Sequence, residues 1–107
     1  MDYDAGNGDH IEAVTSFDNN WNEQLISDLA TVLETKQGRR VVWSILEQCG
    51  IHNEFPSDHV DMLRAAGKRD LGLAVREWIL TSNSDAYTLM RNEDLDKQQI
   101  RKELLNG

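Results

Sequence analysis

The fold of this chain is decided by one stretch, Gln37-Gly38-Arg39-Arg40-Val41-Val42-Trp43-Ser44-Ile45-Leu46-Glu47-Gln48-Cys49-Gly50. It is the densest apolar run in an otherwise polar sequence. Its apolar residues would cover most of the circumference of a helix, and they are Val41, Val42, Trp43, Ile45, Leu46 and Cys49. A helix that is apolar around most of its surface is surrounded by other elements, and glycine commonly follows the last residue of a helix. The stretch therefore predicts a central helix from about Lys36 to Cys49, ended by Gly50.

Apolar residues at helical spacing predict further helices on both sides of this stretch. The expected helices cover about residues 20–34, 58–80, 85–91 and 94–105. Pro56 stops any helix that precedes it, and Ser57 and Ser84 are the expected caps of the helices that follow them. Phe55, just ahead of Pro56, is expected to enter the core. Because no segment alternates like a strand, we predict an all-α fold, a small bundle of about five helices.

The net charge of −8 lies entirely in the first third of the chain. Residues 1–35 carry eight acids and no lysine or arginine, whereas residues 36–107 carry eleven acids and eleven bases. We expect residues 1–18 to form an acidic N-terminal arm and residues 19–107 a helical domain. Ile11, Val14 and Phe17 recur every three residues and indicate a short helix in this arm. Its apolar side would dock either on this domain or on another chain.

The central stretch has an echo later in the chain, because Gly38-Arg39-Arg40 resembles Gly67-Lys68-Arg69. When the two segments are aligned, Trp43 pairs with Gly72 and Cys49 pairs with Trp78. Glycine inside a helix costs about 0.5–1 kcal/mol relative to alanine, and a close approach of two backbones would offset that cost. We hypothesise that the two helices cross with each indole over the small residue of the other. The alternative is coincidence in a composition rich in small residues.

The basic pairs of the echo allow two interpretations. Arg39 lies on the same side of its helix as Trp43, so it is expected to pair with a carboxylate or stack on an aromatic ring. The acid would come from the preceding helix or be Asp70. Alternatively, the bases together contact a phosphate or a carboxylate of a partner. The candidate partner-binding residues are therefore Ile11, Val14, Phe17, Arg39, Arg40, Lys68 and Arg69.

The sequence carries no pattern that indicates catalysis, and we expect no metal and no cofactor. The single cysteine, Cys49, excludes an internal disulfide and is expected to be a small buried hydrophobe. Acids and histidines gather in the connector before the helix at about 58–80, but their spacing matches no standard zinc pattern. There is no phosphate-binding loop and no dinucleotide fingerprint. We predict a protein that is not an enzyme.

The composition also limits the classes of partner. An acidic chain is a poor ligand for nucleic acid, although the four bases after the glycines would be the surface of such a module. No apolar run approaches the roughly 20 residues that span a bilayer, and the N-terminus lacks the features of a signal peptide. We therefore expect protein partners, no nucleic acid and no membrane, in a protein that is not secreted.

Three motifs carry a resemblance to a known family: Gly38-Arg39-Arg40, Gly67-Lys68-Arg69, and the sequence Tyr-x-x-Met-x-x-Glu from Tyr87 to Glu93. Together they resemble a family of small helical proteins of tailed bacteriophages that are encoded among head and tail genes. The similarity covers about residues 37–93. Asp70 departs from the family, in which asparagine is commoner. The resemblance implies a virion-associated or late-expressed phage protein and no catalytic residue.

Our leading interpretation is a non-catalytic virion protein that binds other particle proteins near the portal, tail or ejection machinery. The alternative is a soluble phage effector whose acidic N-terminal region inhibits a host or defence protein. The expected partners are accordingly other phage virion proteins or a host protein, and a homo-oligomer is allowed. The expected location is the virion or the host cytoplasm.

Overall fold

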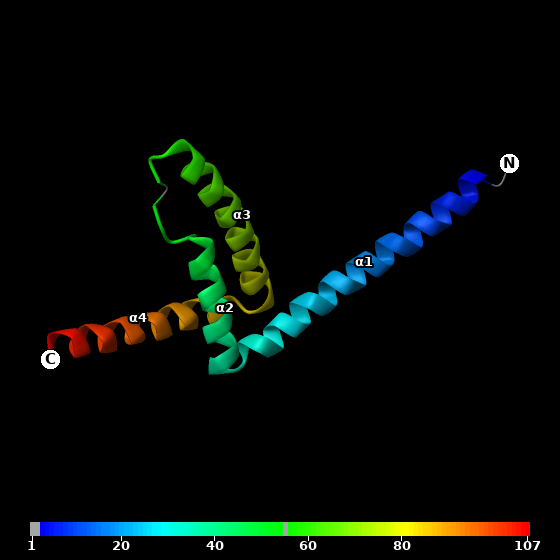
Figure 1. The fold of residues 1–107 in the computed structure, drawn as a ribbon. Helices are drawn as coiled ribbons and strands as arrows, with labels where there is room; N and C mark the ends of the chain where they lie inside the picture. The colour runs from blue at the N-terminus through cyan, green and yellow to red at the C-terminus, as the bar shows by residue number, and fades with distance from the viewer. Residues whose placement is uncertain (1–2, 55) are drawn as a thin grey trace.

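The computed structural model describes residues 3–54 and 56–107, with side chains from Gly8 onward. It consists of four helices, α1 (Tyr3–Leu33), α2 (Lys36–Cys49), α3 (His59–Ser82) and α4 (Ser84–Asn106), drawn in Figure 1. The described part of the chain contains no strand, which confirms the all-α prediction. Phe55, which we expected in the core, and the carboxylates of Asp2 and Asp4 in the acidic arm lie outside the described residues.

The number of helices differs from the five that we predicted, because two expected breaks are absent. The segment that we read as an arm followed by a helix from about residue 20 is the single helix α1. The two C-terminal helices expected at 85–91 and 94–105 are likewise one helix, α4. Asn19, Asn20 and Asn92 lie at the expected breaks, but asparagine costs only about 0.7 kcal/mol inside a helix. No glycine or proline, which cost more, lies near them.

The central helix has the limits that the sequence predicted. The Thr35 hydroxyl accepts a hydrogen bond from the backbone N–H of Gly38 at 2.9 Å and caps the start of α2. Gly50 ends α2 in the left-handed conformation, with φ 69°. The caps of the next two helices are each displaced by one residue from our expectation. Asp58 instead of Ser57 caps α3, and Asn83 instead of Ser84 caps α4, because their side-chain oxygens accept from the first-turn N–H groups.

The core lies where α2 meets the other three helices. Four of its residues come from α2, including Trp43 and the free thiol Cys49, which confirms the central position of this helix. The buried hydrophobic residues in the described part of the chain are Leu33, Val42, Trp43, Leu46, Cys49, Ile51, Ile79, Ala86 and Met90. Only the end of α1 and the start of α4 contribute to this core.

The predicted crossing of α2 and α3 exists at Gly72, but its side-chain partners differ from our hypothesis. A Cβ on Gly72 would overlap Ile51 and approach the Cβ of Cys49 within 2.6 Å, so the two helices are close only because this residue is glycine. Trp43 packs elsewhere, and Trp78 is 42% exposed. Gly67 has open space around it. The pseudo-symmetric indole packing is therefore wrong, because Gly72 of α3 lies against Cys49 at the end of α2 and Ile51 in the connector.

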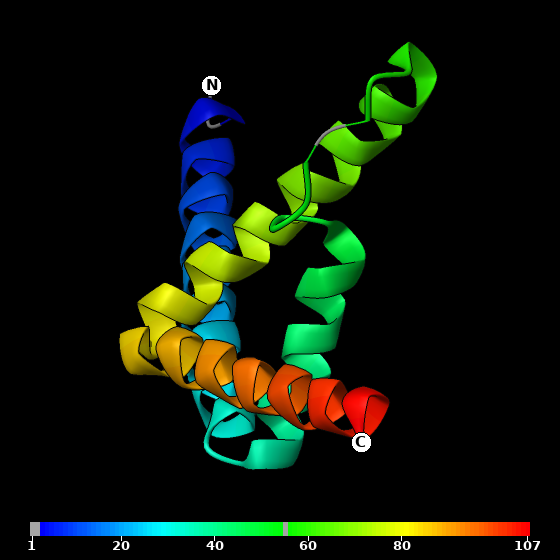
Figure 2. The same cartoon turned by 90° about the vertical axis from the view of Figure 1, so that its left-hand side faces the viewer.

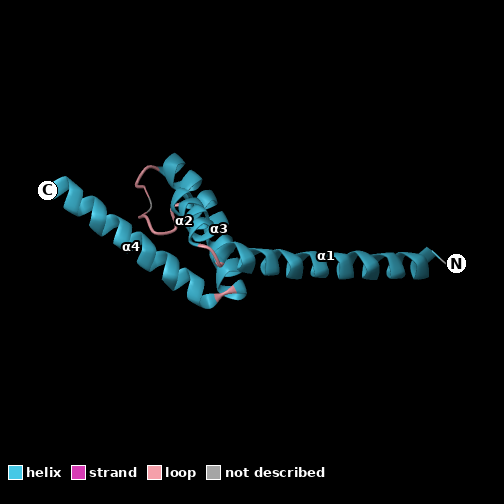
Figure 3. Cartoon of the chain, turned by 90° about the horizontal axis from the view of Figure 1, so that it is seen from below, coloured by secondary structure: helices cyan, strands magenta, loops and turns pink. Residues whose placement is uncertain are grey.

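The molecule is elongated, with principal dimensions of 79 × 39 × 16 Å and a radius of gyration of 19.9 Å. A compact domain of this length has a radius of gyration of about 13 Å. The cause is visible in Figures 1 and 3, where α1 and α4 extend in opposite directions from the pair formed by α2 and α3. Every residue from Gly8 to Leu25 and from Leu95 to Gly107 is exposed. Figure 2, turned by 90°, shows that α4 crosses beside α2 at the base of the molecule.

This shape leaves an unusually large surface in contact with solvent. The accessible area is 8421 Å² for a 12.2 kDa chain. A folded monomer of that mass exposes about 6,100 Å², so the excess is roughly 2,300 Å². Within residues 3–54 and 56–107, no helix combines the length and apolarity needed to cross a membrane.

Candidate functional site

Arg39 is occupied by contacts within the chain. Its Nε donates to Oε1 of Glu93 at 2.7 Å and its Nη2 to Oε2 at 3.5 Å, with the two side chains 14% and 23% exposed. Its Nη1 also donates to the carbonyls of Leu33 and Glu34, at 3.0 and 3.1 Å. Carbonyls at a helix end lack intrahelical donors, so Arg39 completes the end of α1 while joining it to α4. The ion-pair interpretation holds, but the acid is neither Asp70 nor an acid of α1.

The other three bases of the echo do not form one surface. Nη1 of Arg69 donates to the carbonyl of Asn53 at 3.4 Å, which ties α3 to the connector after α2. Arg40 and Lys68 are exposed and line one shallow depression. Val41 and Ile45, two of the apolar residues of the deciding stretch, line it too and are also exposed. Arg40 and Lys68 therefore lie on one surface. Arg39 and Arg69 instead make hydrogen bonds within the chain.

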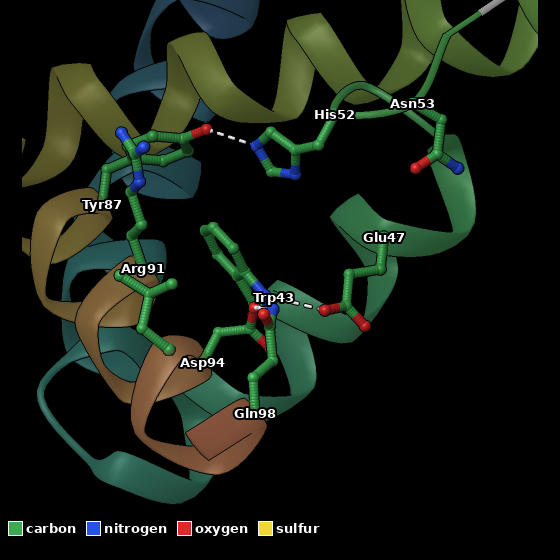
Figure 4. A pocket seen from close by; sticks show the side chains of 9 residues that line it. Trp43, Glu47, His52, Asn53, Tyr87, Arg91, Asp94 and Gln98 are labelled. Atoms are coloured by element: carbon green, nitrogen blue, oxygen red, sulfur yellow. Dashed lines mark hydrogen bonds between the residues drawn. The ribbon is translucent and has the colours of Figure 1, made fainter. Parts of the chain in front are cut away.

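An aromatic cluster joins the connector to α2 and α4. The rings of Trp43 and His52 stack with centroids 5.1 Å apart, and the ring of Tyr87 lies 5.7 Å from Trp43. Nε2 of His52 and the hydroxyl of Tyr87 are hydrogen-bonded at 2.7 Å, and the indole N–H of Trp43 donates to Glu47 at 3.0 Å. Figure 4 shows these side chains converging from three segments. The cluster holds the connector against α4.

The same side chains line an open pocket of about 510 Å³ between α2 and α4, whose outer rim includes Arg91, Asp94 and Gln98 (Figure 4). The polar atoms of the aromatic cluster bond in two pairs, His52 with Tyr87 and Trp43 with Glu47. In the described residues, no group of three or more His, Cys, Asp and Glu side chains is placed to hold a metal ion. Asp58, from the connector that we considered, caps α3.

The apolar side of α1 is exposed over four turns. We call it the α1 stripe, and it consists of Ile11, Val14, Phe17, Trp21 and Leu25. Phe17 and Trp21 are 66% and 64% exposed, so the stripe does not dock on its own domain. Trp21 and Leu25 fall within the separate helix that we expected at about residues 20–34, but in the single helix α1 they lie on the same side as Ile11, Val14 and Phe17. They are exposed because the residues of α1 that pack in or against the core are Leu29 and Leu33.

A second apolar surface lies in a groove of about 370 Å³ between α2 and α4. We call it the α2–α4 groove. Its apolar lining comes from the buried Trp43 and Met90 and the exposed Ile100. Its charged lining consists of the bases Lys36, Arg39, Arg40 and Lys97 and the acids Glu93, Asp94 and Asp96. Because Arg39 and Glu93 neutralise each other, the groove lining keeps three bases and two acids. The groove therefore has a net positive charge, although the whole chain is acidic. Lys36 and Lys97 are far apart in sequence, which is why sequence analysis missed them.

The comparison with protein families supports the resemblance to a phage protein family. The model of a family described as Bbp19-like phage protein matches residues 29–92. The matched segment runs from the last turn of α1 to the middle of α4 and so covers all the core residues. No curated protein and no solved structure matches the chain. The α1 stripe and the exposed end of α4 lie outside the match.

Proposed function

This chain belongs to the Bbp19-like phage protein family, and we propose that it is a non-catalytic component of the phage particle that binds other particle proteins near the portal, tail or ejection machinery. The family match covers the packed body, which supports a common scaffold within the family. The parts that extend from this scaffold would then carry the contacts particular to this protein.

The observation that carries the proposal is the exposed α1 stripe. Helices in water owe most of their stability to the packing of an apolar face, yet every residue of α1 from Gly8 to Leu25 is exposed. Large exposed apolar surfaces mark sites of protein interaction. The excess accessible area of roughly 2,300 Å² is comparable to what specific protein interfaces bury. A protein built to bind other proteins through helices explains both features.

Two further features favour binding over catalysis. The imidazole of His52 and the indole N–H of Trp43 in the aromatic-lined pocket are bonded to Tyr87 and Glu47, which supports a role of these side chains in holding the connector in place. The conspicuous basic residue Arg39 supports the junction of α1, α2 and α4. The residues of these motifs therefore stabilise the fold, and the exposed parts of α1 and α4 are the surfaces that we assign to partner binding.

Mass spectrometry of purified particles tests the proposal. The expected result is that the protein is present at a fixed copy number per particle. A phage carrying Phe17→Glu and Trp21→Glu should assemble particles that lack the protein. Ser16→Glu and Asn19→Glu, which add the same charge on the opposite side of α1, should leave its incorporation unchanged. Absence of the wild-type protein from purified virions would refute the proposal.

The second candidate function is a soluble effector that acts on a host or defence protein. It is favoured by the acidity of α1, which carries six acids and no lysine or arginine between Tyr3 and Leu33. In that case the protein would be found in the host cytoplasm and be absent from virions. Affinity capture from host lysate would recover one host protein at fixed stoichiometry, and the recovery would depend on the acids of α1.

A further inference from the structure

We propose that the α1 stripe of one molecule docks in the α2–α4 groove of a second copy of this chain, head to tail. The inference goes beyond particle binding, because it concerns the chain's own copies and predicts assembly of the purified protein. It rests on three observations: matching apolar surfaces, complementary charge, and the opposite directions of the two exposed helical ends.

The apolar surfaces match in kind and in length. The α1 stripe runs from Ile11 to Leu25, about 21 Å at 1.5 Å per residue. On α4, Met90, Lys97 and Leu104 follow one another at seven-residue intervals, so they share one side of the helix over the same length. Met90 is buried in the groove, whereas Leu104 is 77% exposed. A helix laid along this side would cover the groove and the exposed end of α4 together.

Charge determines which surface can receive the stripe. Asp18 and Asp28 continue the alternating three- and four-residue spacing of Val14, Trp21 and Leu25, so both carboxylates lie on the stripe. If two α1 helices paired in parallel, Asp18 would face Asp18 and Asp28 would face Asp28 across an apolar interface. Unpaired buried carboxylates are costly, and α1 has no lysine or arginine to offset them. The stripe therefore requires a basic partner surface.

The α2–α4 groove offers that surface. Lys36, Arg40 and Lys97 surround its apolar floor, and Arg39 already neutralises Glu93. Asp94 and Asp96 reduce the positive charge without reversing it. Farther along α4, Arg101 and Lys102 add two bases against the single acid Glu103. The groove and the end of α4 thus combine exposed apolar residues with an excess of bases, as the acidic stripe requires.

The shape of the molecule makes this contact repeatable. Because α1 and α4 extend in opposite directions (Figure 1), a copy whose stripe occupies one groove still offers its own groove to a third copy. Such contacts between different surfaces build rings or filaments. The excess area of roughly 2,300 Å² per chain would supply one interface of the size found in stable assemblies.

Two variants of the full chain test the contact by sedimentation velocity. The stripe variant carries Phe17→Glu and Trp21→Glu, and the groove variant carries Lys97→Glu and Ile100→Glu. All four residues are exposed, so far-ultraviolet circular dichroism and the thermal midpoint should match those of the wild type. The control carries Ser16→Glu and Asn19→Glu, which add the same charge as the stripe variant on the opposite face.

Wild type and control should form oligomers larger than a dimer as concentration rises. Each of the other two variants should be monomeric, with association weakened by at least about 30-fold, as for loss of interface hot spots. An equimolar mixture of the two variants should yield a dimer and nothing larger. The intact stripe of the groove variant can dock in the intact groove of the stripe variant, and the two surfaces left over are both mutated.

The remaining outcomes overturn the inference. If α1 helices pair with each other, the groove variant alone will still associate and mixing will restore nothing. If the wild type is monomeric at every concentration, the stripe binds a different protein. That result would leave the proposed role in the particle intact, since detection of the protein in virions does not depend on self-association.

Discussion

Arg39 and Glu93 are 54 positions apart in sequence and form an ion pair with two hydrogen bonds, the shorter of 2.7 Å. Arg39 belongs to the Gly-Arg-Arg motif and Glu93 ends the Tyr-x-x-Met-x-x-Glu motif, so the pair physically links two of the three motifs on which the sequence resemblance was based. Of the other residues in the Tyr-x-x-Met-x-x-Glu motif, Met90 is buried in the core and Tyr87 is hydrogen-bonded to His52. That motif is one side of α4 packed against α2.

Removal of either partner of the ion pair should destabilise the body of the protein. We expect Arg39→Ala and Glu93→Ala each to lower the free energy of unfolding by about 1.5–3 kcal/mol, the range for hydrogen bonds to charged groups. Arg39→Lys should recover little of the loss, since lysine lacks the fork that reaches Glu93 and the carbonyls of α1 at once. Urea unfolding of the single and double variants measures the coupling. Additive effects of the two alanine substitutions would contradict a direct interaction.

The glycines inside α2 and α3, which are Gly38, Gly67 and Gly72, should respond differently to alanine. A Cβ on Gly38 would overlap the carbonyl group of Val32, and one on Gly72 would overlap Ile51. Both substitutions should destabilise, by about 1–3 kcal/mol as for other overpacked sites. Gly67→Ala should instead stabilise by about 0.5–1 kcal/mol, because the site is open and alanine favours a helix. Thermal unfolding of the three variants measures the order. A loss at Gly67 equal to that at Gly72 would restore the symmetric packing that the structure contradicts.

The sequence predicted the helical class and the limits of α2 because those features depend on local rules. The apolar circumference of 41–49, the stop at Gly50 and the burial of Cys49 all follow from spacing and backbone preference. The helix count failed for the opposite reason. Asparagines favour caps and turns, but their preference is weak, and no glycine or proline lies beside Asn19, Asn20 or Asn92 to strengthen it.

The candidate site was harder to predict because it depends on contacts between distant segments. Arg39 was expected to form an ion pair with an acid. The acid is Glu93 on α4, and residue spacing alone cannot select it from the nineteen acids of the chain. Ile11, Val14 and Phe17 were predicted as partner-binding residues from their narrow pattern, with docking on this domain as the alternative, and the structure shows them exposed. Trp21 continues that pattern, but nothing local shows that α1 leaves the core before reaching it. The groove lined by Lys36 and Lys97 exists only after α2 and α4 have packed.

The tryptophans provide a test that separates the core from the exposed stripe. Trp43 is buried and stacked on His52, so Trp43→Ala should cost about 3–5 kcal/mol of unfolding free energy. Trp21→Ala should change it by less than about 0.5 kcal/mol, as at other exposed positions, while reducing self-association. Denaturant unfolding under dilute conditions gives the first quantity and sedimentation the second. A large loss of monomer stability in Trp21→Ala would mean that α1 packs on its own domain.

Salt should weaken the association between copies, because the proposed contact pairs an acidic helix with a net basic groove. The Debye length falls from about 10 Å at 0.1 M to about 3 Å at 1 M ionic strength, so exposed attractions are screened. We expect the dissociation constant to rise with sodium chloride in the wild type. The rise should be smaller in Lys97→Gln, which removes one of the three unpaired bases of the groove without adding an acid. Sedimentation velocity across a salt series measures both slopes. Association that strengthens with salt in both proteins would indicate a purely apolar contact and would remove the reason for assigning the acidic stripe to this groove.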